Sequence, residues 1–367
     1  MNRNIPPLPT TKPIRSLIIA LLFLCPSIRA YSQPGKEKSL SGYKHATVRL
    51  PPSDSVPGAR QTSLFQHFEV IDERPDTARI GLHFRYTWDS YRQLTLGHPV
   101  REELAAYLDK HFARPDAPYT ALIVLRKLWL SNVYYFEEEN PLNPDTHLEK
   151  IRLRLRAEVY AARDGVYTPL FRFDSVAVTM TNSYSRWGYD LVGMLNDLAD
   201  SASLVTTRKA GKGRSLRLEE IEQFNHSRFS ILTDTSIVRT RGVYASFNEF
   251  RNNEPSIQDF LVREVKDKTR LYIKNAAGEM TYSPNAWGYC DGKDIFVMKD
   301  GILYRTWREG KGYYFYYEED DGRHPHHNGA YVPPLSPYGE PPAHGIFGNS
   351  GKVDCIFAVD MDTGDIY

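Results

Sequence analysis

Residues 150–160 of the chain read KIRLRLRAEVY, and this stretch decides the fold of the first half of the protein. Apolar side chains occupy every second position from 151 to 159, and charged side chains occupy positions 150, 152, 154, 156 and 158. A period of two is that of a β-strand whose two faces meet different surroundings. We therefore predict a strand that turns one face to an apolar core and carries Arg152, Arg154 and Arg156 on the other.

The residues after this strand predict a β-hairpin. Asp164-Gly165 is a two-residue turn signal, and residues 167–181 then return as the partner strand. The apolar phase of the returning strand slips between Phe173 and Val176. Such a slip predicts a β-bulge at that place.

Further strands and helices flank the hairpin on both sides. Residues 78–88 alternate as a strand does, and the strongly apolar residues 119–129 favour a buried strand over a helix. Residues 101–112 and 190–202 place their apolar side chains at helical spacing. We predict that these elements form one mixed α/β layer domain over residues 61–207. Their order resembles that of small domains of bacterial envelope accessory proteins.

The second half of the chain predicts short antiparallel strands. Residues 208–214 (RKAGKGR) combine glycine with four cations and predict an exposed linker. Glycine-containing turns then separate five short runs of strand-forming residues: 270–274, 287–290, 294–298, 302–307 and 313–317. This spacing is typical of a meander, so we predict a β-rich domain over residues 215–367, built as a small barrel or a curled sheet. The expected fold class is α+β.

Two motifs in the second half resemble a known pattern. Residues 241–257 read RGVYASFNEFRNNEPSI, and residues 287–297 read WGYCDGKDIFV. They are similar to uncharacterised exported proteins of Gram-negative bacteria, in which a Gly-Val-Tyr and an Asn-Pro-Ser box precede a Trp-Gly-Tyr-Cys-Asp-Gly hairpin. The resemblance spans roughly residues 228–310. It implies export and no particular activity.

The N-terminal residues have the order of a secretory signal peptide. Basic residues precede the nine apolar residues 17–25 (LIIALLFLC), and Ala30-Tyr31-Ser32 supplies small residues for cleavage. Nine helical residues reach about 14 Å, about half of the bilayer hydrocarbon, so we expect membrane contact only through this segment and only if it is not cleaved. We predict a signal peptide over residues 1–32. Residues 33–60 are polar and rich in Pro, Gly and Ser, which predicts a flexible tether.

The charge of the mature chain excludes one class of partner. Removal of residues 1–32 takes away four basic residues and no acidic one, which changes the net charge from +1 to −3. No large field of one sign remains that would attract nucleic acid or an anionic membrane. The expected location is periplasmic, cell-surface or extracellular, and the expected partner is another envelope protein or a glycan.

Cys290 and Cys355 are the two cysteines that remain after cleavage. In an oxidising compartment they could form a disulfide, which would stabilise the fold by roughly 4 kcal/mol through loop closure. Both lie in apolar surroundings, which equally suits two buried thiols. Both interpretations stay open, because the sequence does not show whether the two Cα atoms come within about 7 Å.

Residues 318–327 (EEDDGRHPHH) hold the most obvious metal-ligand candidates of the chain. His324, His326 and His327 follow four acidic residues, and together with Asp320 they could bind zinc. The proline between the first two histidines excludes a helix, so a complete site would need a further ligand from elsewhere. A solvated loop tip explains the same residues with fewer assumptions. No other cofactor is expected.

Two groups of side chains are candidates for a ligand-binding surface. The ladder of Arg152, Arg154 and Arg156, with about 6.8 Å between successive residues, could bind an acidic partner or a phosphate-bearing glycan. Such a ladder also pairs across a sheet with charges of the returning strand, which is the interpretation that we favour. Trp287 and Trp307 could stack on sugar rings, although aromatic runs in β domains more often alternate between two packed faces.

The last residues contain an acidic motif. Residues 360–365 (DMDTGD) resemble part of a calcium-binding loop, but the glycine is fifth instead of sixth and no glutamate follows at the twelfth position. We expect a Thr-Gly turn between the two final strands.

These features favour binding over catalysis. The chain contains no Gly-x-Ser-x-Gly, Ser-x-x-Lys or His-Glu-x-x-His motif, although a catalytic triad can assemble from distant residues. We therefore expect an exported, envelope-associated protein that acts by binding or assembly. The alternative is a metal-dependent hydrolase that uses the histidines and acidic residues of residues 318–327.

Overall fold

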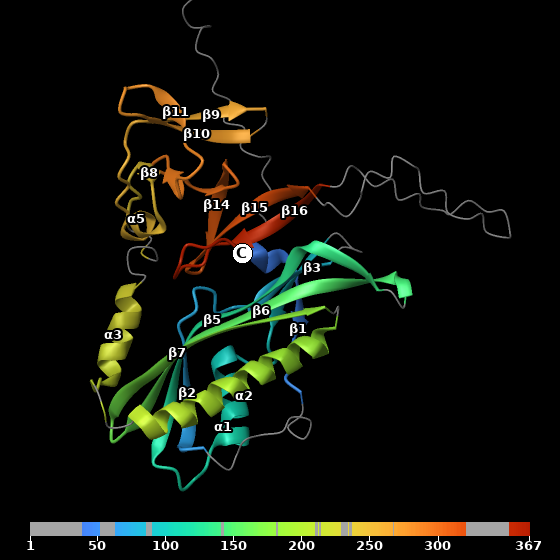
Figure 1. Cartoon of the computed structure of the whole chain (residues 1–367), viewed down its shortest axis with the longest axis vertical. Helices are drawn as coiled ribbons and strands as arrows, with labels where there is room; N and C mark the ends of the chain where they lie inside the picture. The colour runs from blue at the N-terminus through green and yellow to red at the C-terminus, as the bar shows by residue number, and fades with distance from the viewer. Residues whose placement is uncertain are drawn as a thin grey trace, which may run out of the picture. The chain divides into compact units, whose positions relative to one another are not determined.

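The computed structural model describes residues 39–51, 63–85, 90–140, 143–180, 183–209, 212, 214–228, 234, 237–266, 268–320 and 352–367 (Figure 1). These residues belong to one compact unit, Ser39–Tyr367. The predicted signal peptide lies outside the described residues. Among the helices that are described, none is both long and apolar enough to cross a membrane. The fold is α+β.

The first half contains a mixed sheet, called sheet A, with seven strands in its described part. The strand order is β1-β4-β3-β5-β6-β7, and β2 pairs with β5 beside β3. The bounds are β1 Lys44–Thr47, β2 Phe65–Asp72, β3 Gly81–Arg85, β4 Ser90–Thr95, β5 Tyr119–Asn140, β6 Asn143–Arg163 and β7 Val166–Met180. Strands β5, β6 and β7 are antiparallel, whereas β2 and β3 pair in parallel with the same edge of β5.

The predicted hairpin is confirmed. Strands β6 and β7 are joined at Asp164 and Gly165, whose φ angles of 55° and 74° are those of a type I′ turn. The predicted position of the bulge is wrong, because the register shifts at Val159/Tyr160, opposite residues 169–171 of β7. Beyond that shift β7 alternates strictly, so Val176 and Val178 lie on the outward face and are each 49% exposed.

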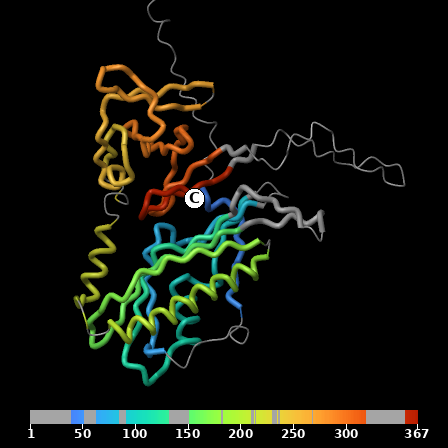
Figure 2. The backbone as a smooth tube through the Cα atoms, viewed as in Figure 1, coloured from blue at the N-terminus to red at the C-terminus, as the bar shows by residue number. Residues whose placement is uncertain are grey.

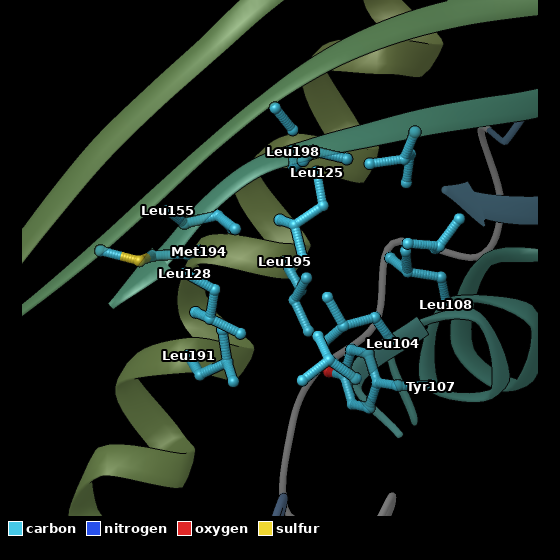
Figure 3. Packing of buried hydrophobic residues seen from close by; sticks show 14 of the residues in the cluster. Leu104, Tyr107, Leu108, Leu125, Leu128, Leu155, Leu191, Met194, Leu195 and Leu198 are labelled. Carbon is cyan, nitrogen blue, oxygen red and sulfur yellow. The ribbon is translucent and has the colours of Figure 1, made fainter. Parts of the chain in front are cut away.

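Two helices cover one face of sheet A (Figure 1). Helices α1 Val100–Phe112 and α2 Tyr184–Lys209 confirm the predicted helical spacing. Figure 3 shows how side chains of both helices meet side chains of the sheet in one apolar core. The labelled residues of this core are Leu104, Tyr107 and Leu108 of α1, Leu191, Met194, Leu195 and Leu198 of α2, and Leu125, Leu128 and Leu155 of the strands.

Part of the segment that the sequence assigns to a flexible tether belongs to this layer. Residues 39–51 contain a short 3-10 helix, η1 Leu40–Gly42, and strand β1, which pairs in parallel with β4. Leu40 and Val48 are buried. The sequence does not reveal β1, because its few apolar residues stand in a polar segment and its partner β4 lies more than 40 residues further along the chain.

The second half is built from two antiparallel sheets. Sheet B has the order β16-β15-β14-β13-β12-β8, and sheet C has the order β11-β10-β9. The strands are β8 Gly242–Tyr244, β9 Phe260–Val265, β10 Lys268–Lys274, β11 Met280–Tyr282, β12 Gly288–Cys290, β13 Ile295–Lys299, β14 Ile302–Glu309, β15 Gly312–Asp320 and β16 Lys352–Ala358. Strands β12 to β15 confirm the predicted meander, and sheet B stays open instead of closing into a barrel.

In the described part of the second half, two short helices accompany these sheets. Helix α3 Leu218–Arg228 follows the predicted linker, the first two residues of which still belong to α2. Helix α5 Phe247–Asn252 begins with Ser246 as its N-cap and packs its phenylalanines into the core of sheet B.

Candidate functional site

In Figure 2 the backbone of the last residues, in red, lies next to the strands of sheet A. Among the described residues, a set of charged side chains joins these two parts of the chain. We call Arg126, Lys127, Arg156, Glu158, Arg228, Asp360 and Asp362 the junction cluster. Strand β5 carries a bulge here, because its register shifts between Leu125 and Lys127. Leu125 and Leu128 both face the apolar core. Arg126 and Lys127, which lie between them in the chain, make ion pairs outside that core.

Lys127 and Asp360 form the centre of this cluster. Their Nζ and Oδ2 atoms are 2.7 Å apart, and their side chains are 8% and 4% exposed. Arg156 lies 3.4 Å from Asp360 and 3.3 Å from Asp362, and Arg228 of α3 lies 2.6 Å from Asp362. The Lys127 ammonium also lies over the ring of Tyr367, 3.2 Å from its centroid. Strands β5 and β6, helix α3 and the C-terminal turn are thereby tied together.

A second set of bonds surrounds Glu158. Its carboxylate accepts hydrogen bonds from Arg126 at 2.8 Å and from the Tyr160 hydroxyl at 3.1 Å. Arg126 also donates to Asn225 of α3 at 2.6 Å. Burial alone would raise the pKa of Glu158, but Arg126, together with Tyr160 and Arg228, outweighs burial and brings that pKa below its ordinary value.

The titration of Lys127 is strongly perturbed. Burial lowers the pKa of Lys127 to about 8, and the neighbouring Asp360 limits this decrease. Burial would raise the pKa of Asp360, but Lys127 and Arg156 bring it below its ordinary value. Perturbed pKa values occur at functional sites and also in structural ion-pair networks. Every member of the junction cluster has a partner from another member, which is the pattern of a structural network.

A cavity of about 30 Å³ lies beside Lys127, Trp129, Tyr314, Asp360 and Tyr367. That volume holds about one water molecule. It is far too small for an organic substrate, because ligand pockets have volumes of roughly 300–1,000 Å³. The junction cluster can therefore hold parts of this chain together, but its cavity offers no room for a substrate.

The predicted basic ladder is divided among three environments. Arg156 belongs to the junction cluster. Arg154 pairs across the sheet with both carboxylate oxygens of Asp174, at 2.9 and 2.8 Å, as the pairing interpretation predicts. Arg152 is exposed on the same face and lies opposite Val178 of β7.

The predicted tryptophans pack against other rings of the same chain. Trp287 stacks on Phe250 with 4.3 Å between ring centroids, and its indole N–H donates to the Gly364 carbonyl at 3.2 Å. The ring centroids of Trp307 and Tyr316 are 4.7 Å apart. Alternate rings of the aromatic run are buried on opposite faces of β15, because Phe315 lies in the core of sheet B and Tyr314 packs near Trp129 of sheet A.

No disulfide joins Cys290 and Cys355, which are both buried thiols in the structure. They lie in β12 and β16, which are separated by three strands of sheet B. Burial raises the pKa of the Cys290 thiol. The interpretation as two small buried side chains therefore describes their environment.

The predicted metal ligands His324, His326 and His327 lie outside the described residues. Asp320 ends β15 opposite Lys352, and its side chain is not among those described. Within the described ranges, no group of three or more His, Cys, Asp or Glu side chains could hold a metal ion. The Thr-Gly turn near the end of the chain is confirmed, because the Gly364 N–H donates to the Asp360 carbonyl at 2.7 Å.

A second candidate surface lies on the outward face of β6 and β7. We call Arg152, Val176 and Val178 the β7 patch. Val178 is paired with Arg152, and Val176 with Arg154. Directly opposed side chains on one sheet face lie about 5 Å apart, so these residues form one continuous area. The sequence pattern does not reveal the exposed valines, because a bulge between Phe173 and Val176 would have kept the apolar side chains of this strand on one face.

Comparisons with known proteins add one structural likeness. No family model matches the chain. No curated protein matches it. Among solved structures, the chain is similar to a Xanthomonas campestris protein of the DUF330 family, with 13% identity and a TM-score of 0.27, over 46% of this chain and 99% of that chain. A TM-score this low supports no statement about fold or function.

Proposed function

We propose that the protein is exported and acts by binding in the cell envelope, with the β7 patch as part of its contact surface. Export is supported by the basic residues, the apolar residues 17–25 and the small residues before Gln33. The resemblance of residues 241–257 and 287–297 to exported proteins of Gram-negative bacteria points in the same direction.

One observation carries the binding role, namely the exposure of Val176 and Val178 next to Arg152 at the edge of sheet A. A single exposed apolar side chain is ordinary, but neighbouring valines on an edge strand favour contact with another chain. The charged side chains of the junction cluster, by contrast, bond to one another. The exposed side chains of the β7 patch are therefore of the kind found at contact surfaces.

Export is tested by fractionating Gram-negative cells that produce the full chain and by determining the mass of the mature protein. We expect the mature chain to begin at Gln33 and to be absent from the cytosol. The matched control is Leu21→Arg, which interrupts the apolar segment and should keep the intact chain in the cytosol. Intact wild-type chain that begins at Met1 in the soluble cytosol would overturn the proposal.

Binding is tested by placing a photo-reactive amino acid at position 178 of the exported chain. We expect a cross-linked product of discrete mass in the envelope fraction. The control is the same amino acid at position 238, because Val238 is 81% exposed and its carbonyl accepts a hydrogen bond from Asn253, at the end of α5. A position-178 product no more abundant than the position-238 product would contradict a contact at the β7 patch.

A further inference from the structure

Strand β7 has one edge that the described part of the chain covers only at its beginning. The strand is last in the order of sheet A and pairs with β6 along its other edge. Near its start, the N–H and carbonyl of Tyr167 both bond to Leu216 at 2.8 Å, and the Leu170 carbonyl accepts from Lys209 at 2.8 Å. Among the described residues, no strand pairs with this edge after Leu170.

Arg172 and Asp174 put charges on the first part of this uncovered edge, but residues 175–179 lack the features that keep edge strands apart. Natural edge strands are blunted by lysine, proline, bulges or short length. In β7, the proline and the bulge both lie before Phe171, where Leu216 and Lys209 already cover the edge. Residues 175–179 read SVAVT and contain no charge, proline or glycine. This segment therefore presents backbone groups and β-branched side chains that are ready to pair.

We propose that residues 174–180 pair with the same residues of a second copy of this chain, in an antiparallel arrangement about a twofold axis at Ala177. This inference names the partner that binds at the β7 patch. It therefore rests on the binding part of the proposed function, and it does not depend on export.

The position of the axis follows from what each register brings together. An axis at Phe173, the middle of β7, would place Thr179 of each copy against Tyr167 of the other, where Leu216 already occupies the edge. An axis at Ala177 avoids that obstacle. It pairs Val176 with Val178 twice and places no like charges opposite each other, because Asp174 then faces Met180.

The chemistry of the strand favours a second copy over an unrelated peptide. A twofold interface uses the same patch on both copies and must be self-complementary. Here the two most exposed valines of β7 meet each other, and Ser175 meets Thr179, with which it can share a hydrogen bond. Seven residue pairs span about 24 Å, which is a small interface. The dimer is therefore expected to be reversible and to depend on protein concentration.

The register is tested by disulfide cross-linking of the mature chain. Val176→Cys and Val178→Cys are prepared separately with distinguishable tags, and each is oxidised alone and in an equal mixture. The mixture should give a several-fold higher yield of disulfide-linked dimer, because residue 176 faces residue 178 of the second copy. Two residues 176 lie diagonally, at about 8 Å, beyond the reach of a disulfide. Equal yields from the mixture and from either variant alone would overturn the proposed register.

The interface itself is tested by analytical ultracentrifugation. Val176→Lys combined with Val178→Lys should raise the dissociation constant of the dimer by at least about tenfold, because lysines on an edge oppose strand pairing. Leu204→Lys is the control, since Leu204 of α2 is 56% exposed and lies outside β7. A wild-type chain that stays monomeric at every concentration, or a dimer that survives both lysines, would overturn the proposal. If the protein is exported but monomeric, the proposed strand pairing is refuted and export is not. If the protein dimerises but stays in the cytosol, export is refuted and the pairing is not.

Discussion

Replacement of Asp360 by Asn removes the carboxylate that faces Lys127 and leaves a buried ammonium without its partner. The two side chains are 8% and 4% exposed, with 2.7 Å between the charged atoms. Loss of one partner of such a buried pair typically destabilises a protein by about 3–5 kcal/mol. The lower end applies here, because the Asn oxygen can still accept a hydrogen bond from Lys127. We therefore expect the free energy of unfolding to fall by about 3 kcal/mol.

The matched variants are Lys127→Met and the double variant with Asp360→Asn. Lys127→Met removes the nearer basic partner of the buried Asp360 carboxylate, so it should also destabilise the fold. The carboxylate still has Arg156 at 3.4 Å. The double variant contains neither charge and should lose less stability than the sum of the two single variants, by about 1–3 kcal/mol.

The assay is urea unfolding at pH 7, followed by tryptophan fluorescence, with the slope of the transition as a check on two-state behaviour. Two results would refute the reasoning. One is an Asp360→Asn variant within about 1 kcal/mol of the wild type, which is less than an unpaired buried charge requires. The other is a double variant whose loss equals the sum of the single losses, because the two groups would then not interact.

Three further predictions concern titration, packing and the cysteines. Because the pKa of Lys127 is lowered to about 8 in the folded protein from an ordinary value of 10.5, unfolding takes up a proton between these values. Urea midpoints should therefore show wild-type stability rising relative to Lys127→Met from pH 8 to 9.5, by up to about 1.4 kcal/mol per pH unit, and parallel profiles would contradict the shift. A Cβ at Gly188 in α2 would collide with the carbonyl oxygen of Arg49, whereas one at Gly193 in the same helix would meet nothing within 4 Å. Gly188→Ala should therefore lower the melting temperature, although alanine favours helices. Gly193→Ala should raise the melting temperature, because it adds up to about 1 kcal/mol to the free energy of unfolding. Similar effects at both sites would contradict the close contact at Gly188. Cys290 and Cys355 should resist a thiol reagent in the native protein and react without reductant in urea, and no reactive thiol under either condition would indicate a disulfide.

The local elements of the first half were predictable from their residues. Alternation over residues 150–160 and the Asp164-Gly165 turn specify β6 and β7, because side-chain period and turn conformation are properties of adjacent residues. The stripe of Leu191, Met194, Leu195 and Leu198 specifies α2 for the same reason, and all four side chains are buried. The helix is longer than predicted because residues at both of its ends pack against other elements.

The site could not be predicted in the same way. Lys127 and Asp360 are 233 positions apart, and no pattern near either residue indicates the other. The bulge in β5 that turns Arg126 and Lys127 to one side also leaves little trace in an apolar stretch. Asp360 and Asp362 were noticed as part of an acidic turn, which the structure contains, but their basic partners come from sheet A and α3.

The sequence by itself determined the period of the strands and helices and the positions of the main turns. These features depend on neighbours along the chain. Only the tertiary structure decided which faces are covered, that the C-terminal turn lies on the basic residues of β5 and β6, and that Val176 and Val178 stay exposed at an edge. The physical reason is that burial and ion pairing depend on which segment lies opposite, and that is set by the topology of the whole fold.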